Sequence, residues 1–335
     1  MSTPDAVAGV LWVGVTLYAV FGGADFGAGF WALFTGRDER GERARSLIDW
    51  AIGPVWEANH VWLIFVLVVL WTAFSGAFAA IFSTLFIPLT LAALGIVFRG
   101  SGFAFHNVAP GFREREVSRV LFGVSSILTP FFMGTVIGAI ASGRVPLGNA
   151  DGDPFTSWFN VVSLVTGLLF VATSAYLAAV FLVHDSRRAE DPEMESYFAK
   201  RAQFAAAATG ALAVIGIFVF RNDARYVYDG LVGEALPLVI LSIIFGIAVM
   251  VALVRGKRTG IRVGAVGAVV TMIWAWGWAQ YPYLLPTSQK ISEGAANDSS
   301  LVSVLVIFGA AVLLVIPSLG LLYVLTQKSV LEEEH

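Results

Sequence analysis

The sequence predicts an all-α, polytopic membrane protein, and three observations support this fold class. The 335 residues are 57% hydrophobic and 13% charged, whereas soluble globular chains carry about 25% charged residues. The mean hydropathy is +0.78. Apolar runs of about 20 residues recur along the chain, and each is long enough to cross a hydrocarbon layer of roughly 30 Å.

Nine such runs are expected to be transmembrane helices. The first run has an acidic start and the length of a spanning helix, which argues against a cleavable signal peptide. The connections between the runs are short, so we expect one integral-membrane domain over 1–335. The runs lie near residues 7–34, 50–71, 78–104, 118–141, 158–183, 202–220, 232–254, 261–281 and 301–326.

Basic residues in the loops predict the orientation of the chain. The loops after the first, third, fifth and seventh runs, together with Lys328, contain 16 of the 21 Lys and Arg residues. The opposite loops contain four, and Arg99 lies inside the third run. Because cytoplasmic loops carry the excess of Lys and Arg, we expect the N-terminus outside and the C-terminus in the cytoplasm. Tryptophans at the outer end of the eighth run, where aromatic residues gather at membrane interfaces, agree with this orientation.

Three ionisable residues fall well inside the first three runs: Asp25, Glu57 and Arg99. With a rise of about 1.5 Å per residue, they lie roughly 13, 10 and 9 Å from the predicted cytoplasmic end. A charge in hydrocarbon is costly unless it is paired, so such residues indicate a functional site by default. Glu57 and Arg99 form the natural pair, although that pair could serve only to join two helices. Asp25 has no evident cation partner, which favours a protonatable site.

Metal and thiol chemistry receive little support from the residues. The chain has no cysteine, which excludes disulfides, thiolate metal sites and thiol catalysis. Glu57 and His60 are spaced like half of a di-iron carboxylate site, but that site needs a second Glu-x-x-His, and the sequence has none. A haem-ligand role for His60 stays open on its residue type alone. We predict that His60 binds neither metal nor haem.

Three segments resemble the signature motifs of subunit II of the cytochrome bd quinol oxidases. They are Gly-Ala-Asp-Phe-Gly-Ala-Gly (23–29), Pro-Val-Trp-Glu-Ala-Asn-His-Val-Trp-Leu (54–63) and Phe-Arg-Gly-Ser-Gly-Phe (98–103). The family's corresponding motifs are Asp-Gly-Phe-Asp-(Leu/Met)-Gly, Trp-(Asp/Glu)-x-Asn-(Gln/His)-Val-Trp-Leu and Phe-Arg-x-x-Gly-Phe. The nine runs and the external N-terminus fit the family along the whole chain. One departure is clear: the first acid of the family's first motif is replaced here by Gly22.

The resemblance implies an architecture and a set of partners. We expect two four-helix bundles, over about 7–141 and 158–281, and a peripheral helix over about 301–326. The partner would be subunit I, which carries haems b and d and oxidises a membrane quinol, menaquinol or ubiquinol, while reducing O2 to water in the bacterial cytoplasmic membrane. Lipids and small accessory subunits are further partners that the resemblance allows, and no feature indicates a nucleic-acid partner.

The resemblance also implies roles for individual residues. No catalytic residue, bound haem or metal is expected in this subunit, which would support assembly and access routes. Asp25 and Glu57 would belong to proton access, and Trp62 would lie on an oxygen route. A polar niche for a structural quinone or a lipid would be lined by Trp56, Glu57, Asn59 and Arg99.

Intramembrane carboxylates are also compatible with a second class of function. A proton-coupled secondary transporter could use Asp25 and Glu57 as coupling carboxylates. Transporters of this kind tend to show repeats with paired, interrupted helices. Here the intramembrane charges cluster in the first three runs and have no counterpart in the fifth to seventh, which disfavours the transporter.

Overall fold

The first predicted run forms one long helical segment with a wider turn in its middle. In the computed structural model, α1 (Thr3–Leu17) continues through a π-helical turn, η1 (Tyr18–Gly22), into α2 (Gly23–Leu33). Ser2 caps the first turn, because its side chain accepts a hydrogen bond from the Asp5 N–H and the Asp5 carboxylate accepts one from the Ser2 N–H. Almost every residue of α2 is buried, so this segment runs through the interior.

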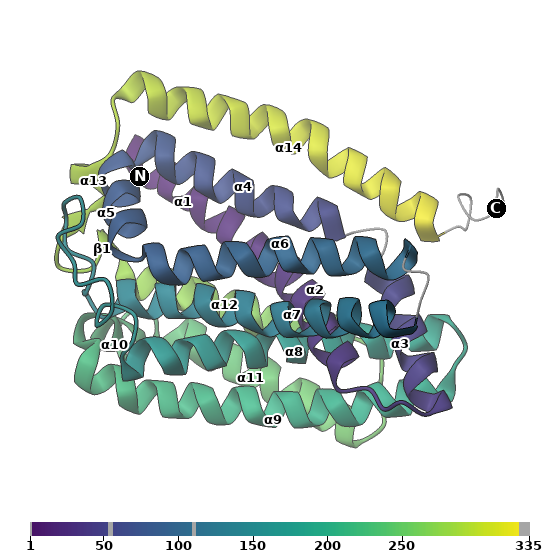
Figure 1. Ribbon diagram of the computed structural model, residues 1–335. Helices are drawn as coiled ribbons and strands as arrows, with labels where there is room; N and C mark the ends of the chain where they lie inside the picture. Colours follow the sequence, from purple (N-terminus) through teal and green to yellow (C-terminus); the bar gives the residue numbers. More distant parts are fainter. Residues whose placement is uncertain (1, 53–55, 109–111, 328–335) are drawn as a thin grey trace.

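The structure describes residues 2–52, 56–108 and 112–327 (Figure 1). Its long helices run roughly along one common direction, with short elements at the two ends (Figure 1). Within the described helices, a few side chains beside the gaps and near the C-terminus are left out, among them those of Trp56 and Glu57.

The second and third runs differ from their predicted boundaries. Residues 50–71 were expected to form one helix, but α3 (Glu39–Ile52) is a separate helix, and α4 (Trp56–Ala73) follows it. The predicted run 78–104 is also divided, into α5 (Ser75–Thr84) and α6 (Phe86–Val108). The axis bends by 118° between α4 and α5. Hydropathy missed these breaks because α5 is itself apolar and because the end of α3 merges with the start of the next run.

The remaining predicted runs each coincide with one long helix. The connection after α12 contains a two-stranded antiparallel hairpin and one short helical turn, which the all-α prediction did not include. The elements are α7 (Phe112–Ala141), α8 (Val161–Arg188), α9 (Pro192–Asp223), α10 (Arg225–Val232), α11 (Leu236–Val254), α12 (Ile261–Gln280), β1 (Tyr283–Leu285), β2 (Gln289–Lys290), α13 (Ile291–Gly294) and α14 (Asp298–Gln327).

The helices have the length and composition of membrane spans. Among the described residues, seven helical segments are long and apolar enough to cross a membrane, or eight if the bent pair α4 and α5 counts as one span. The described apolar part of α6, Phe86–Gly102, is shorter than the others. The chain is therefore a multi-pass membrane protein, while the count of nine spans and the orientation stay predictions.

In the part of the chain that the structure describes, buried apolar side chains form two large cores and one smaller core. The first surrounds α2 and includes side chains from α3, α8, α9, α11 and α12. The second joins α1, α4 and α5 to the hairpin and α14. The third lies between α10 and α12. The division of the chain into two bundles stays a prediction.

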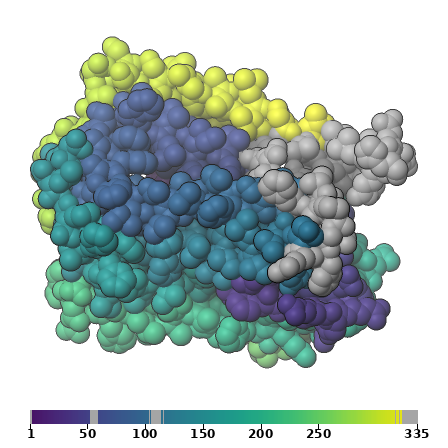
Figure 2. Space-filling view, in the orientation of Figure 1, coloured from purple at the N-terminus to yellow at the C-terminus, as the bar shows by residue number. Residues whose placement is uncertain are grey.

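The last helix lies at the edge of the molecule, as a peripheral helix would. It packs on α1 and α4 and forms the upper rim in Figures 1 and 2. Large side chains on it are highly exposed, with Leu313 at 76% and Leu314 at 71%. Such apolar exposure suits a surface that faces lipid or another subunit rather than water.

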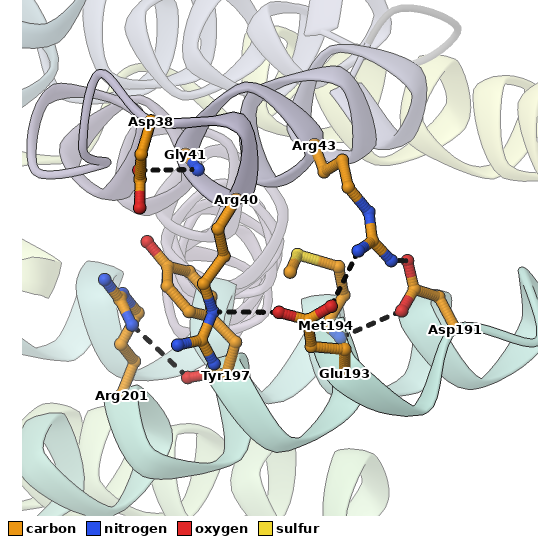
Figure 3. A network of polar contacts seen from close by, with 9 residues as sticks. All are labelled: Asp38, Arg40, Gly41, Arg43, Asp191, Glu193, Met194, Tyr197 and Arg201. Carbon is orange, nitrogen blue, oxygen red and sulfur yellow. Dashed lines mark hydrogen bonds and ion pairs between the residues drawn. The ribbon is translucent and has the colours of Figure 1, made fainter.

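A cluster of charged side chains fastens α3 to the start of α9 (Figure 3). The two guanidinium nitrogens of Arg43 lie 2.6 Å from carboxylate oxygens of Asp191 and Glu193. These hydrogen bonds raise the pKa of Arg43 above its ordinary value. Asp191 is also the N-cap of α9, because its side chain accepts a hydrogen bond from the Met194 N–H. Burial raises the pKa of Asp191, but this hydrogen bond and the charge of Arg43 outweigh burial, so its pKa lies below the ordinary value.

Candidate functional site

Arg99 and Asp25 form a buried ion pair between α6 and α2. Nη2 of Arg99 donates to Oδ1 of Asp25 at 2.7 Å and to the Asp25 backbone carbonyl at 3.0 Å. The exposed fractions of the two side chains are 1% and 2%. An isolated charge at such a place would be strongly unfavourable, and pairing with added hydrogen bonds is what makes burial tolerable.

A third helix completes the surroundings of the guanidinium. Nη1 of Arg99 donates to the hydroxyl of Ser126 on α7, and that hydroxyl donates in turn to the backbone carbonyl of Phe122. The rings of Phe26 and Phe122 lie 5.0 and 4.3 Å from the guanidinium carbon. Aromatic faces attract a cation most strongly when water is excluded. The site therefore satisfies Arg99 by charge, hydrogen bonds and ring contacts together.

Gly29 is required for this close arrangement. A Cβ atom at position 29 would lie 2.7 Å from Nη1 of Arg99 and would also overlap the side chain of Ser126. The absence of a side chain thus lets α6 and α7 place their polar groups directly against α2. This explains one of the glycines in the motif at residues 23–29.

Two atoms of the pair remain available for a further interaction. Oδ2 of Asp25 and Nε of Arg99 are buried and have no hydrogen-bond partner among the residues that the structure describes. Buried polar atoms of this kind are usually satisfied by a water, an ion or a ligand. The pair can therefore accept one more polar group without losing the contacts between its members.

An aromatic group lies beside the ion pair. The imidazole of His60 stacks on the ring of Phe26 at 6.1 Å, and Tyr18 meets both rings at 6.5 and 6.3 Å in edge-on arrangements. His60 and Tyr18 both interact electrostatically with Asp25. Phe26 links the two parts of the site, since it contacts this group and the guanidinium of Arg99.

A small pocket lies beside Phe122. Its volume is about 30 Å³, and its lining includes Arg45, Asp49, Ser118 and Phe122. That volume is enough for a water molecule, because a cavity needs roughly 10–15 Å³ of this measure to hold one. Phe122 lines this pocket and also covers the guanidinium of Arg99.

The structure corrects one expectation about the charged residues. Asp25 was expected to lack a cation partner, and that expectation is wrong, because Arg99 is its partner. The predicted depths of Asp25 and Arg99 from the cytoplasmic end differ by about 4 Å. An arginine side chain is long enough to cover that difference. The side chain of Glu57 lies outside the described residues, so the predicted Glu57–Arg99 pair stays a prediction.

The other predicted site residues are placed as follows. Asn59 is buried and its side-chain amide lies 3.4 Å from the backbone carbonyl of Phe21. Trp62 is half-buried and meets Phe65 edge-on at 6.4 Å. The side chain of Trp56 lies outside the described part. Among the described residues, no group of three or more His, Asp or Glu side chains could hold a metal ion.

Sequence reasoning missed the contributions of α7 and η1. Ser118, Phe122 and Ser126 recur at intervals of four residues, which places them on one face of a helix. That spacing was a signal for a polar stripe inside an apolar helix. Tyr18 carried no comparable signal, because a tyrosine in a membrane helix is usually an interface residue.

The fold and the site define a class of protein: a multi-pass helical membrane protein in which a buried Asp–Arg pair joins the first, interior segment to α6. Comparison with known sequences then gives the family. The sequence matches the family described as cytochrome bd terminal oxidase subunit II over residues 3–326. The chain belongs to this family, which confirms the resemblance found in the three motifs. Membership in a family of second subunits implies that the chain has a partner, subunit I.

Individual relatives agree with this assignment. A putative cytochrome bd menaquinol oxidase subunit II of Bacillus subtilis (strain 168) is 23% identical over 92% of this chain and 91% of its own length. The cytochrome bd-I ubiquinol oxidase subunit 2 of Escherichia coli (strain K12) is 32% identical over 40% of this chain and 34% of its own length. A chain in the structure of bd oxidase from Geobacillus thermodenitrificans superposes with a TM-score of 0.80 and 27% identity, covering 96% of this chain and 98% of that one. None of these relatives supports the transporter alternative.

Proposed function

We propose that this chain is the haem-free second subunit of a bacterial quinol:O2 oxidoreductase. In this proposal, haems b and d and the oxidation of quinol belong to subunit I, and this chain supports assembly and provides access routes. Nine spans, an external N-terminus and a cytoplasmic C-terminus in the bacterial plasma membrane are parts of the same proposal. Family membership over residues 3–326 carries it.

Two observations favour a role of Asp25 in proton access. Its Oδ2 is buried and has no hydrogen-bond partner among the described residues, so one carboxylate oxygen is available while Oδ1 holds Arg99. The pocket beside Phe122 lies at the end of the molecule that carries α3, which is the cytoplasmic end in the proposed orientation. Protons would enter there, pass Phe122 and load Asp25, with Arg99 stabilising the carboxylate between transfers.

The other residues of the site complete the proposal. Glu57 would share in proton access, and Trp62 would border the oxygen route. Trp56, Glu57, Asn59 and Arg99 would line a niche for a structural quinone or a lipid. The contact of the Asn59 side chain with the backbone carbonyl of Phe21, within η1, supports a place for this residue near the ion pair.

The class of function is tested by purifying the chain with its partner. We expect an optical spectrum with haem b and haem d bands that follow subunit I through purification and are absent from this chain when it is purified alone. Haem bands that stay with this chain after separation would contradict the proposal.

The role of Asp25 is tested by Asp25→Asn in the purified complex. Asparagine keeps the size and a hydrogen bond to Arg99 but cannot carry a proton. We expect slower quinol-driven oxygen reduction, with a larger loss at high pH where protons are scarce, and an unchanged haem spectrum. Wild-type turnover at every pH would move proton entry elsewhere in the complex.

A further inference from the structure

Tyr18 lies on the same side of the first segment as Asp25. The residues Tyr18, Gly22 and Asp25 follow a spacing of four and then three, which places them along one stripe of a helix. The stripe crosses η1, the π-helical turn at Tyr18–Gly22. Single π-helical turns inside α-helices are rare, and those that occur are often found at functional sites.

The ring of Tyr18 lies against the backbone of Gly22, one turn closer to Asp25. The three atoms nearest to a Cβ at position 22 would all belong to this ring, with Cε2 at 2.8 Å and Cζ at 3.4 Å. Helical side chains usually lean toward the N-terminus, so the position of this ring is unusual. The missing side chain at Gly22 makes room for the ring at this position. Tyr18 accordingly interacts electrostatically with both Asp25 and Arg99.

Oη of Tyr18 and Oδ2 of Asp25 are both buried polar atoms that need a hydrogen-bond partner. Both atoms are buried, and neither has a hydrogen-bond partner among the residues that the structure describes. Leaving a buried polar atom without a hydrogen bond is costly in free energy. A single water with two such partners satisfies both atoms at once, and internal waters typically make about three hydrogen bonds.

We propose that a bound water joins Oη of Tyr18 to Oδ2 of Asp25, and that Tyr18 is the next group of the proton route after Asp25. This inference rests on the proposed proton-access role of Asp25. Tyr18 precedes Asp25 by seven positions, a rise of about 10 Å along the helix backbone, so the relay would carry a proton from Asp25 toward the middle of the membrane. Tyr18 is a positioning and relay residue in this scheme and touches neither haem nor quinol.

Each transfer conserves protons and involves no electrons. The O–H bond of protonated Asp25 breaks as its proton moves to the water, and the water passes one of its own protons to a lone pair on Oη of Tyr18. The original hydroxyl proton of Tyr18 leaves on the opposite side, toward the next acceptor. Asp25 then returns to the carboxylate form that pairs with Arg99.

The decisive variant is Tyr18→Phe, assayed in the complex with subunit I by quinol-driven oxygen reduction across a pH series. It removes only the hydroxyl and keeps the ring against Gly22. We expect turnover at high pH to fall about tenfold, less than the roughly 10²–10⁴-fold typical of direct general acid–base groups, with the haem spectrum unchanged. The matched control is Tyr176→Phe, because the hydroxyl of Tyr176, like that of Tyr18, is buried and has no hydrogen-bond partner among the described residues. Turnover equal to that control at every pH would overturn the proposal.

A double variant separates this inference from the proposal on which it rests. If Tyr18 acts through Asp25, Tyr18→Phe causes no further loss in an Asp25→Asn background. An additive loss would show that Tyr18 acts independently and would overturn the relay. Wild-type turnover of Asp25→Asn alone would instead remove the proton-access role itself. A slow Asp25→Asn combined with an unaffected Tyr18→Phe would refute only the inference about Tyr18.

A rescue experiment uses the space that the ring occupies. Tyr18→Ala empties the volume beside Gly22, so that Gly22→Asp in the same chain can place a carboxyl group there. We expect this pair to recover most of the turnover that Tyr18→Ala loses, and Gly22→Asn with Tyr18→Ala to recover none. Equal recovery by the two pairs would indicate that filling the space is sufficient, and recovery by neither would mean that no proton carrier acts at this position; both results would count against the relay.

Discussion

Oδ1 of Asp25 lies 2.7 Å from Nη2 of Arg99, inside the protein and out of contact with solvent. The two residues lie on different helices and are 74 positions apart in the sequence. Both side chains depend on the same contact for their charge balance. The effects of changing them should therefore be coupled.

Breaking the pair from one side should destabilise the complex strongly. Arg99→Gln leaves the Asp25 carboxylate buried without its cation, and losses of about 3–5 kcal/mol are typical for one-sided removal of a buried pair. The double variant Asp25→Asn with Arg99→Gln should lose less than the sum of the two single variants, because no uncompensated charge remains. Thermal unfolding of the purified complex measures the stability of the two single variants and of the double variant.

The control is Arg225→Gln, which breaks an exposed pair with Asp229 and should have no measurable effect on stability. Strict additivity of the two buried substitutions would argue against the coupling.

Hydropathy was sufficient to predict most of the helices. The segments α7, α8, α9, α11, α12 and α14 each coincide with a predicted apolar run, because a membrane span must satisfy its backbone hydrogen bonds within a helix. The same reasoning could not find α3, whose apolar face is narrow and whose sequence is rich in charge. It also could not find the break before α6, because both sides of the break are apolar.

The site was only partly predictable for a related reason. Asp25 and Arg99 were identified because charges are rare and costly in such helices. Their pairing was missed because depth estimates along separate helices carry no information about the rotation of each helix. Ser126, Phe122 and Tyr18 were missed because their residue types are ordinary in membrane helices. Tertiary packing around Gly29 and Gly22, rather than composition, makes these residues part of the site.

Gly29→Ala should destabilise the protein by overpacking. The added methyl group would overlap Ser126 and lie 2.7 Å from Nη1 of Arg99, and neither neighbour can move without losing a buried hydrogen bond. Overpacking of this kind typically costs about 1–3 kcal/mol. Gly210→Ala on α9 is the matched control, since nothing lies within 4 Å of its added Cβ. Thermal unfolding should show a loss for Gly29→Ala and no loss for Gly210→Ala. Equal midpoints for the two variants would contradict the tight packing at Gly29.

The contact between α3 and α9 should weaken in acid. The pKa of Asp191 is lower in the folded protein than its ordinary value, so its contribution to stability is complete above the unfolded pKa of about 3.9. That contribution is lost as the pH falls through the lower, folded pKa. Hydrogen exchange of α3 should therefore rise below about pH 4 in the wild type. Asp191→Asn should show faster exchange already at neutral pH, with little further change in acid.

Asp153→Asn provides the control for that measurement. Hydrogen bonds from the Thr156 and Phe155 N–H groups also lower the pKa of Asp153, but Asp153 lies in the connection between α7 and α8. Its substitution should leave the exchange of α3 unchanged at every pH. Acid sensitivity of α3 that persists in Asp191→Asn would assign the effect to another group.

His60→Gln should leave the haem spectrum of the complex unchanged. The imidazole of His60 stacks on Phe26 beside the ion pair, and the described residues contain no group of side chains around it that could hold a metal. Glutamine keeps a polar group of similar reach but is a poor haem ligand. Optical spectra of the reduced and oxidised complex provide the measurement. Loss of a haem band from an assembled complex would identify His60 as a ligand after all.

Glu57→Gln now has a different expected outcome from the one that its predicted pairing with Arg99 suggested. Removing a sole partner of Arg99 would cost about 3–5 kcal/mol, but Arg99 keeps Asp25 and Ser126 in this variant. We therefore expect the free energy of unfolding of the complex to change by less than about 1 kcal/mol, because Glu57 would not be the main partner of the buried guanidinium. A role in proton access, in contrast, predicts slower quinol-driven oxygen reduction with a larger loss at high pH. The two measurements separate the roles: a large loss of stability would make Glu57 a second partner of Arg99, and unchanged turnover would remove it from the proton route.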